Sequence, residues 1–148
     1  MASICLYFKV HQPYQLKRYT TGEIHKSHQY EDVESDAACI NRLADFCFLP
    51  ANKIILDAIK ESDFLFKVTF SISGVILDLL EKYRPDVIAS FQQLVRTGCI
   101  DILGETYHHS LSSLHSEKEF ERQVFLHTVK IKTLFDIEPV IFRNTELI

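Results

Sequence analysis

The chain has 148 residues, of which 47% are hydrophobic and 24% are charged, and its formal net charge at pH 7 is −4. Length and composition are those of about one folded domain. The acidic balance argues against a surface that binds nucleic acid or an anionic membrane. The longest hydrophobic run, residues 4–8, is far shorter than the roughly 20 residues of a membrane span, and no signal-peptide pattern opens the chain. We therefore expect a cytoplasmic protein.

The first third of the chain predicts one strand, a long polar segment and two helices. Residues 3–10 are apolar at nearly every position, which is typical of a strand buried on both faces of a parallel sheet. Residues 11–36 show no clear period and exceed the usual loop length, so we expect a functional or partly ordered segment. Asp36 is a candidate N-cap for a helix over 37–47, and a proline begins a second helix over 50–62.

In the remaining two thirds of the chain, predicted strands alternate with predicted helices. The patterns predict strands over 64–72, 99–103 and 140–142, and helices over 75–83, 87–95 and 117–134. The last helix opens with a capping box in which Ser116 is followed three residues later by Glu119. The four cysteines form no CxxC pair and lie in apolar runs, so we expect them to be buried, reduced thiols.

This order predicts an α/β fold with a parallel sheet of four strands and right-handed crossovers. No glycine-rich turn follows the first strand, so a dinucleotide site is not indicated. A doubly wound open sheet could close at this length, whereas a complete barrel of the triosephosphate isomerase type needs about 200 residues or more.

Polar groups follow each predicted strand at its carboxyl end, where parallel α/β proteins build their active sites. The four strand ends are residues 11–13, 71–73, 105–109 and 143–146. We expect these ends to meet at one edge of the sheet, although loops also begin with polar residues for no functional reason. Asp101 lies between apolar neighbours within a strand, where a buried carboxylate would need a partner or a raised pKa.

Three stretches in this order carry a resemblance to a known family. Residues 4–13 end in His-Gln-Pro, residues 98–111 join a glycine and Asp101 to an aromatic-rich turn, and residues 139–148 contain Glu146. Together they resemble the first three signature regions of glycoside hydrolase family 57, most closely in its α-amylase-type members. The resemblance covers essentially the whole chain.

The resemblance implies a (β/α)7 barrel that hydrolyses or transfers α-1,4-glucans with retention of configuration. Residues 1–148 would form the N-terminal part of that single catalytic domain, with its first four strands, and would be inactive alone. The implied substrate is an α-glucan or maltooligosaccharide, and neither a cofactor nor a metal is expected. Hydrolysis and glucan transfer both stay open, as does the oligomeric state.

The resemblance also assigns residues. Glu146 matches the catalytic nucleophile, and His11 matches a residue that lines the sugar subsite at the cleaved bond. Asp101 stands where the family commonly has a glutamate, and the general acid is an aspartate in a fourth region that this sequence does not contain. The expected substrate contacts are His11, Gln12, Asp101, Glu105, His108 and Asn144.

Three alternatives are open at this point. Glu105 could supply the second carboxyl group that a retaining glycosidase needs. A metal-dependent carbohydrate hydrolase or deacetylase could draw ligands from His11, Asp101, His108, His109 and His115, although adjacent histidines on an extended segment point in opposite directions. A non-catalytic glucan-binding fragment could stack tyrosines on sugar rings, but such a protein has no need of a nucleophile at Glu146.

Overall fold

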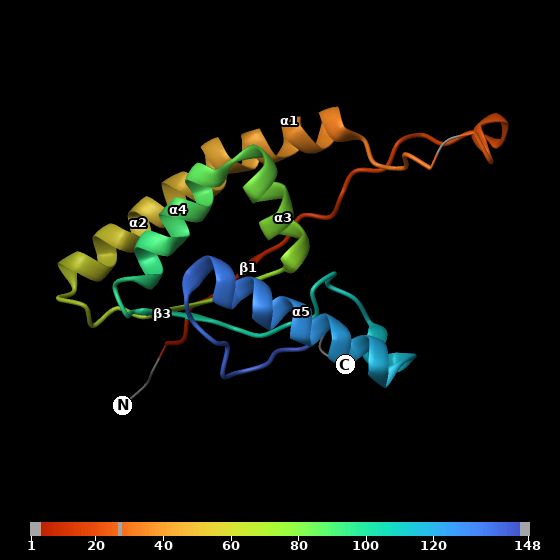
Figure 1. Cartoon of the computed structure of the whole chain (residues 1–148). Helices are drawn as coiled ribbons and strands as arrows, with labels where there is room; N and C mark the ends of the chain where they lie inside the picture. The colour runs from red at the N-terminus through yellow and green to blue at the C-terminus, as the bar shows by residue number, and fades with distance from the viewer. Residues whose placement is uncertain (1–3, 27, 146–148) are drawn as a thin grey trace.

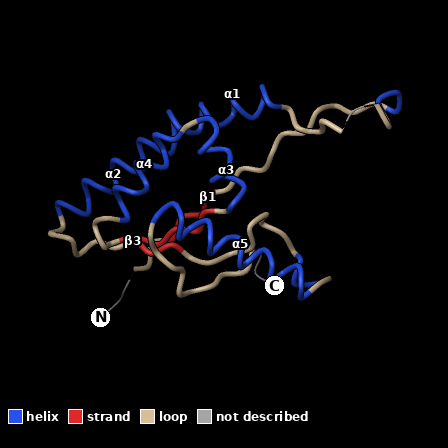
Figure 2. Tube along the Cα trace, in the orientation of Figure 1, coloured by secondary structure: helices blue, strands red, loops and turns tan. Residues whose placement is uncertain are grey.

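The computed structural model of the chain describes residues 4–26 and 28–145. Its sheet has three parallel strands in the order β1-β2-β3, namely β1 (Tyr7–Val10), β2 (Val68–Ile72) and β3 (Ile100–Ile102) (Figures 1 and 2). The register pairs Val10 with Ile72 and Phe70 with Ile102. The predicted α/β fold with a parallel sheet is therefore confirmed.

The fourth predicted strand, over 140–142, is reduced to a single parallel bridge between Gly104 and Phe142. Around this bridge the Gly104 amide donates to the Ile141 carbonyl at 2.8 Å, and the Arg143 amide donates to the Gly104 carbonyl at 2.9 Å. Ahead of the bridge, residues 137–141 diverge from β3 and leave a pocket of about 420 Å³ between the two segments. This divergence is why no longer ladder forms in the described part of the chain.

The helical region that follows the polar segment differs from the prediction in two ways. It is one continuous rod made of α1 (Val33–Leu43), the π-helical turn η2 (Ala44–Phe48) and α2 (Leu49–Glu61). A proline at position 50 has no amide hydrogen and its ring clashes with the carbonyl four residues earlier, and a widened turn relieves that clash. The N-cap is Asp32 rather than Asp36.

The other helices match the predicted ranges within a few residues. They are α3 (Gly74–Tyr83), α4 (Pro85–Val95) and α5 (Glu117–Phe135), with short 3-10 turns η1 (Thr21–Glu23) and η3 (Ser112–Leu114). The Ser116 hydroxyl caps α5 by accepting from the Glu119 amide at 3.3 Å, as the capping box predicted. Within the described residues, none of these helices combines the length and apolar character needed to cross a bilayer.

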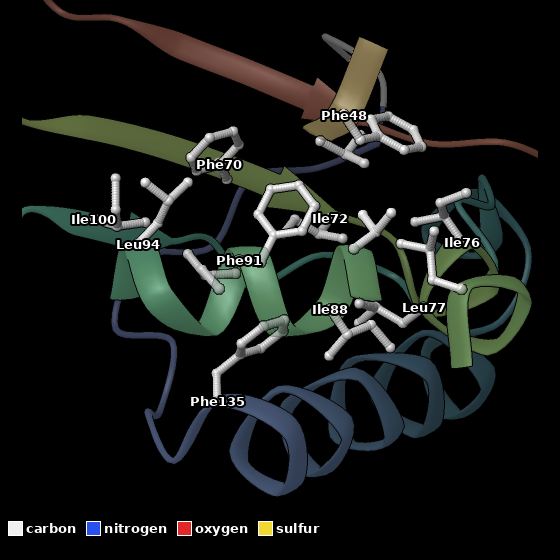
Figure 3. Packing of buried hydrophobic residues seen from close by; sticks show 14 of the residues in the cluster. Phe48, Phe70, Ile72, Ile76, Leu77, Ile88, Phe91, Leu94, Ile100 and Phe135 are labelled. Atoms are coloured by element: carbon white, nitrogen blue, oxygen red, sulfur yellow. The ribbon is translucent and has the colours of Figure 1, made fainter. Parts of the chain in front are cut away.

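The hydrophobic core lies between the sheet and the helices that follow β2 and β3. Figure 3 shows Phe91 of α4 between Phe70 of β2 and Phe135 of α5, and all three side chains are buried. The Phe70 and Phe91 rings meet edge to face with centroids 5.4 Å apart, a favourable aromatic geometry. Because side chains alternate along a strand, the opposite face of the sheet carries residues such as Lys9 and Ser71.

Burial of the first strand is where the prediction was wrong. Tyr7, Phe8 and Lys9 are exposed and only Val10 is buried, because β1 has a single neighbour, β2, in the described structure. The cysteine prediction was also only partly right: Cys99 is buried and Cys39 is partly buried, whereas Cys5 and Cys47 are exposed, and all four are free thiols.

The polar segment between β1 and α1 is partly ordered, as predicted. It projects away from the sheet and helices (Figure 1). Leu16 and Glu31 form an antiparallel bridge, and the Asp32 amide donates to the Gln15 carbonyl at 2.8 Å. The buried carboxylate of Asp36 accepts from the Gln15 amide at 2.7 Å and so ties the base of this segment to α1.

Candidate active site

The carboxyl ends of the three strands bring together five polar side chains, which we call the rim cluster: His11, Ser71, Ser73, Glu105 and His109. Parallel strands place these ends at the same edge of the sheet. His11 Nδ1 lies 2.7 Å from Ser73 Oγ, and the rings of His11 and His109 stack with centroids 4.2 Å apart. The prediction that these strand ends meet is confirmed for β1, β2 and β3.

Glu105 is the centre of the cluster and is only 2% exposed. The Ser71 hydroxyl donates to its Oε1 at 2.7 Å, and His109 Nδ1 lies 3.1 Å from its Oε2. A buried carboxylate is tolerated when its oxygens are hydrogen-bonded in this way. Both oxygens are thereby occupied by protein groups, so this arrangement favours a supporting role for Glu105 over that of a general acid facing a leaving group.

His11 is half-buried, and burial lowers the pKa of its imidazole below the ordinary value. The neighbouring ring of His109 lowers the pKa further, Glu105 opposes these effects, and Lys9 adds a small decrease. His11 is therefore a neutral ring near pH 7. A neutral imidazole both donates and accepts hydrogen bonds, which suits it to binding hydroxyl groups.

His109, rather than the expected His108, joins the cluster. His108 is exposed, its amide donates to Gln123 Oε1 at 3.3 Å, and its ring lies against Tyr107. The backbone of His109 has φ of 56°, a left-handed conformation that turns the chain at this point. Alternation indicated that only one of the two histidines could face the site, but the turn that decides which one leaves no clear sequence signal.

Two further expected contacts lie outside the rim cluster. Asp101 is exposed and lines the pocket beside β3. It precedes Glu105 by four residues, about 13 Å along an extended chain. The side-chain amide of Gln12 donates to the carbonyl of its own neighbour, Pro13, at 3.2 Å.

The segment after α5 comes close to the cluster through two threonines. Thr145 Oγ1 lies 2.6 Å from Thr106 Oγ1, and both residues are buried. The side-chain oxygen Oδ1 of Asn144 accepts from the Thr145 backbone amide at 3.0 Å. Thr106 directly follows Glu105, so the fourth predicted strand end meets the third. Glu146, the expected nucleophile, lies outside the described residues.

His127 of α5 forms a polar contact with the sheet. Its Nε2 lies 2.8 Å from the Ile72 carbonyl, to which it donates. The side chain is fully buried, and Nδ1 has no hydrogen-bond partner among the described residues. Burial lowers the pKa of His127, while the charge of Glu105 acts in the opposite direction.

The loop that carries Glu105 and His109 is anchored through Tyr107. The Tyr107 hydroxyl donates to the carboxylate of Asp78 at 2.8 Å, and Lys130 of α5 donates to Asp78 at 2.7 Å and also to Glu81. Burial and the bond to Asp78 raise the pKa of the Tyr107 phenol. A Cβ placed on Gly74 would lie 2.4 Å from the Tyr107 ring, so only glycine fits beneath it.

No three histidine, cysteine, aspartate or glutamate side chains in the described ranges are arranged to hold a metal ion. Of the five residues considered as metal ligands, the structure brings together His11 and His109 only. Asp101 lies upstream in β3, and His108 and His115 are exposed.

Comparisons with known proteins agree on one family. The family model described as "Glycosyl hydrolase family 57" matches residues 5–148. A curated Methanocaldococcus jannaschii protein named "Putative alpha-amylase" is 37% identical over 147 residues, which cover 95% of this chain and 30% of that protein. The chain thus spans less than a third of the length of this relative.

Two solved structures share the fold. One is 4-alpha-glucanotransferase from Thermococcus litoralis, with 18% identity, a TM-score of 0.57, and coverage of 88% of this chain and 17% of that one. The other is a GH57 branching enzyme from Thermococcus kodakaraensis in complex with glucose and additives. It has 11% identity, a TM-score of 0.61, and coverage of 91% of this chain and 31% of that one.

Proposed function

This chain belongs to glycosyl hydrolase family 57, and from that membership we propose that it is the N-terminal part of a retaining enzyme acting on α-1,4-glucans. The enzyme is of the α-amylase or 4-α-glucanotransferase type. The observation that carries the proposal is the convergence of the three resembling stretches. The His11 ring in the first stretch contacts the His109 ring in the second. Thr145 in the third stretch is hydrogen-bonded to Thr106, which follows Glu105 in the second.

The same proposal assigns residues 1–148 to a single (β/α)7 catalytic domain. Three parallel strands in sequential order, with a bridge from Gly104 to Phe142 that begins a fourth, are what the first half of such a barrel requires. The coverage of about a third of the M. jannaschii relative supports this view. The remaining strands would then come from chain outside these 148 residues.

In the proposed mechanism Glu146 attacks the anomeric carbon and forms a covalent glycosyl-enzyme. A second carboxyl group, about 5 to 5.5 Å away, protonates the leaving oxygen and then activates the water or the acceptor hydroxyl. That group comes from outside this chain. His11 contacts the sugar at the cleaved bond, Gln12 and Asn144 are adjacent contacts, and the proposal does not depend on Asp101 or His108.

The test replaces Glu146 in the full-length protein that contains this chain. Glu146→Gln keeps the side-chain shape but removes the attacking charge, so sugar binding should persist while turnover falls by several orders of magnitude. In Glu146→Ala, azide should restore part of the rate and give a product of inverted configuration. Glu138→Gln makes the same substitution at an exposed residue in the preceding stretch of sequence, so it is the matched control and should leave turnover unchanged.

Loss of one buried polar contact costs about 2–3 kcal/mol, or about 100-fold in rate. Turnover of Glu146→Gln within about 100-fold of wild type, without azide rescue, would therefore remove Glu146 from the nucleophile's role. The 148-residue chain alone should release no reducing sugar from amylose, since it carries no general acid.

A further inference from the structure

The stacked histidines of the rim cluster have different partners at equivalent atoms. His11 Nδ1 meets the hydroxyl of Ser73 at 2.7 Å, whereas His109 Nδ1 meets the carboxylate of Glu105 at 3.1 Å. A neutral imidazole carries its single proton on either Nδ1 or Nε2, and the partner of one nitrogen decides the state of the other.

Ser73 fixes the proton of His11 on Nε2. Its Oγ is the N-cap of α3 and accepts from the Ile76 amide at 3.5 Å. Ser73 is fully buried, so its one hydroxyl proton needs an acceptor, and His11 Nδ1 lies within 2.7 Å. The hydroxyl therefore donates to Nδ1, and the neutral ring of His11 presents an N–H group at Nε2.

Glu105 fixes the proton of His109 at the opposite position. A carboxylate only accepts hydrogen bonds, and Oε1 is already occupied by the hydroxyl proton of Ser71. Oε2 must receive its proton from His109 Nδ1. In the neutral form of the ring, the proton then lies on Nδ1, and Nε2 is an unprotonated acceptor.

Both Nε2 atoms are open to a ligand. Neither has a hydrogen-bond partner in the described structure. Among the described residues, the buried side-chain nitrogen or oxygen without a partner is His127 Nδ1 alone. The Nε2 atoms of His11 and His109 are therefore reached by solvent, and they belong to rings whose centroids lie 4.2 Å apart.

We infer that this histidine pair is a two-sided hydroxyl site, in which His11 Nε2 donates to one sugar hydroxyl and His109 Nε2 accepts from a neighbouring one. His109 is thus a specificity-determining contact, and Ser73 and Glu105 are positioning residues that set the two protons. The identity of the ligand as a glucan rests on the proposed function, whereas the opposite protonation of the two rings rests on the hydrogen bonds alone. A pair with one protonated Nε2 is poorly suited to share a metal ion, which needs a lone pair from each ring.

The first test observes the protons directly. Nitrogen-15 NMR of the full-length protein, labelled in histidine and recorded above pH 7, distinguishes protonated from bare ring nitrogens. His11→Gln and His109→Gln spectra identify the two signals. The expected pattern is a proton on Nε2 of His11 and on Nδ1 of His109. The same pattern in both rings would overturn the inference, whatever the ligand.

The second test moves the proton of each ring to the other ring nitrogen. Ser73→Asp keeps a good N-cap but offers only acceptor oxygens, so His11 should move its proton to Nδ1. Glu105→Gln offers an amide N–H, so His109 should move its proton to Nε2. Either change should weaken maltooligosaccharide binding by about 10- to 100-fold, because one hydroxyl then meets the wrong group.

Ser116→Asp is the matched control, since it makes the same substitution at the N-cap of α5 and touches neither ring. It should leave both protonation patterns and the affinity unchanged. Unmoved histidine signals in Ser73→Asp would contradict the positioning role of Ser73. A third outcome separates the two proposals. If the NMR spectra show the expected protonation of both rings but the wild-type protein does not bind maltooligosaccharides, the result counts against the glucan proposal and leaves the hydroxyl site in place.

Discussion

His127 is a fully buried histidine whose charged form the folded protein disfavours. Its Nε2 donates to the Ile72 carbonyl, and its Nδ1 has no partner among the described residues. Burial lowers its pKa, and the bond to Ile72 and then the charge of Glu105 oppose this effect. In the unfolded chain its pKa is about 6.5. Between the lowered pKa and about 6.5, the unfolded state binds more protons than the native state. Stability is therefore complete above about pH 6.5 and is lost as the pH falls below it.

We predict that the free energy of unfolding, measured by urea denaturation, decreases from about pH 7.5 to about pH 5.5 by up to about 1.4 kcal/mol per pH unit for this group. His127→Gln keeps an N–H for the Ile72 carbonyl but cannot be protonated, so its pH dependence should be weaker. His115→Gln removes an exposed histidine and should retain the wild-type dependence. Parallel curves for wild type and His127→Gln would contradict the prediction.

At the level of single residues, sequence reasoning placed His11, Glu105 and the serines of residues 71–73 at strand ends, but it assigned no role to the serines. His11 and Glu105 were recognisable because each follows a strand. Ser71 and Ser73 carry no distinctive signal, since serines are common at strand ends, yet they hold the two ionisable groups in place. The apolar neighbours of Asp101 left its burial open, and the structure shows that it is exposed, because alternation puts it on the open face of β3.

At the level of elements, the alternation of strands and helices was predictable, whereas several boundaries depended on tertiary contacts. Asp36 has the chemistry of an N-cap, but its carboxylate binds the distant Gln15 amide and Asp32 caps the helix instead. Pro50 indicated a break between two helices, but the chain absorbs it in a π-helical turn. Propensity at these positions was outweighed by contacts that a local pattern does not contain.

Lys130 of α5 joins that helix to α3 through ion pairs. Its ammonium group binds Asp78 and Glu81 of α3 and is mostly shielded from solvent. We predict that Lys130→Met lowers the free energy of unfolding by about 1–3 kcal/mol, because Asp78 loses a charged partner beneath Tyr107. Chemical denaturation measures this change.

The matched control for this ion pair lies on the same helix. Lys132→Met removes a cation whose distance to Glu138 is 3.6 Å with both side chains well exposed. Such surface pairs contribute little, so stability should change by less than about 0.5 kcal/mol. Equal losses in Lys130→Met and Lys132→Met would show that the shielded pair has no special role.

The contact between α3 and the loop after β3 depends on the absence of a side chain at Gly74. We predict that Gly74→Ala destabilises the protein by about 1–3 kcal/mol, because the new methyl group would lie 2.4 Å from the Tyr107 ring. The additional cost should disappear in a Tyr107→Ala background, which a double-mutant cycle measures. Gly22→Ala, where the nearest atom is 4.0 Å away, should be neutral. A Gly74→Ala cost that persists without the ring would assign the effect to the helix itself.

At the scale of the whole molecule, the helices pack tightly against β2 and β3, whereas the edge strand β1 is exposed. A continuous cluster of buried apolar residues joins β2 to α4 and α5, whereas β1 has one neighbouring strand among the described residues. Beside this edge lies an apolar groove of about 260 Å³, lined by residues of β1, η2, α2, β2 and α4. An exposed apolar surface of this kind is typical of a site that another segment or partner covers.

This groove predicts how the 148-residue chain behaves alone. Phe8 is 42% exposed at the open edge and forms part of the groove wall with Phe48 and Ile55. We predict that the 148-residue chain binds an uncharged apolar dye such as Nile red under native conditions. If the chain is part of a (β/α)7 barrel, as proposed, the full-length protein should bind much less, because further strands would cover the groove. Phe8→Ser should reduce dye binding, whereas Phe125→Ser, the same change on the exposed side of α5, should not. Fluorescence titration, combined with circular dichroism to verify the fold, measures both. Dye binding that is equal in wild type and Phe8→Ser would instead indicate that the isolated chain is loosely packed throughout, since a disordered core binds dye without regard to this edge.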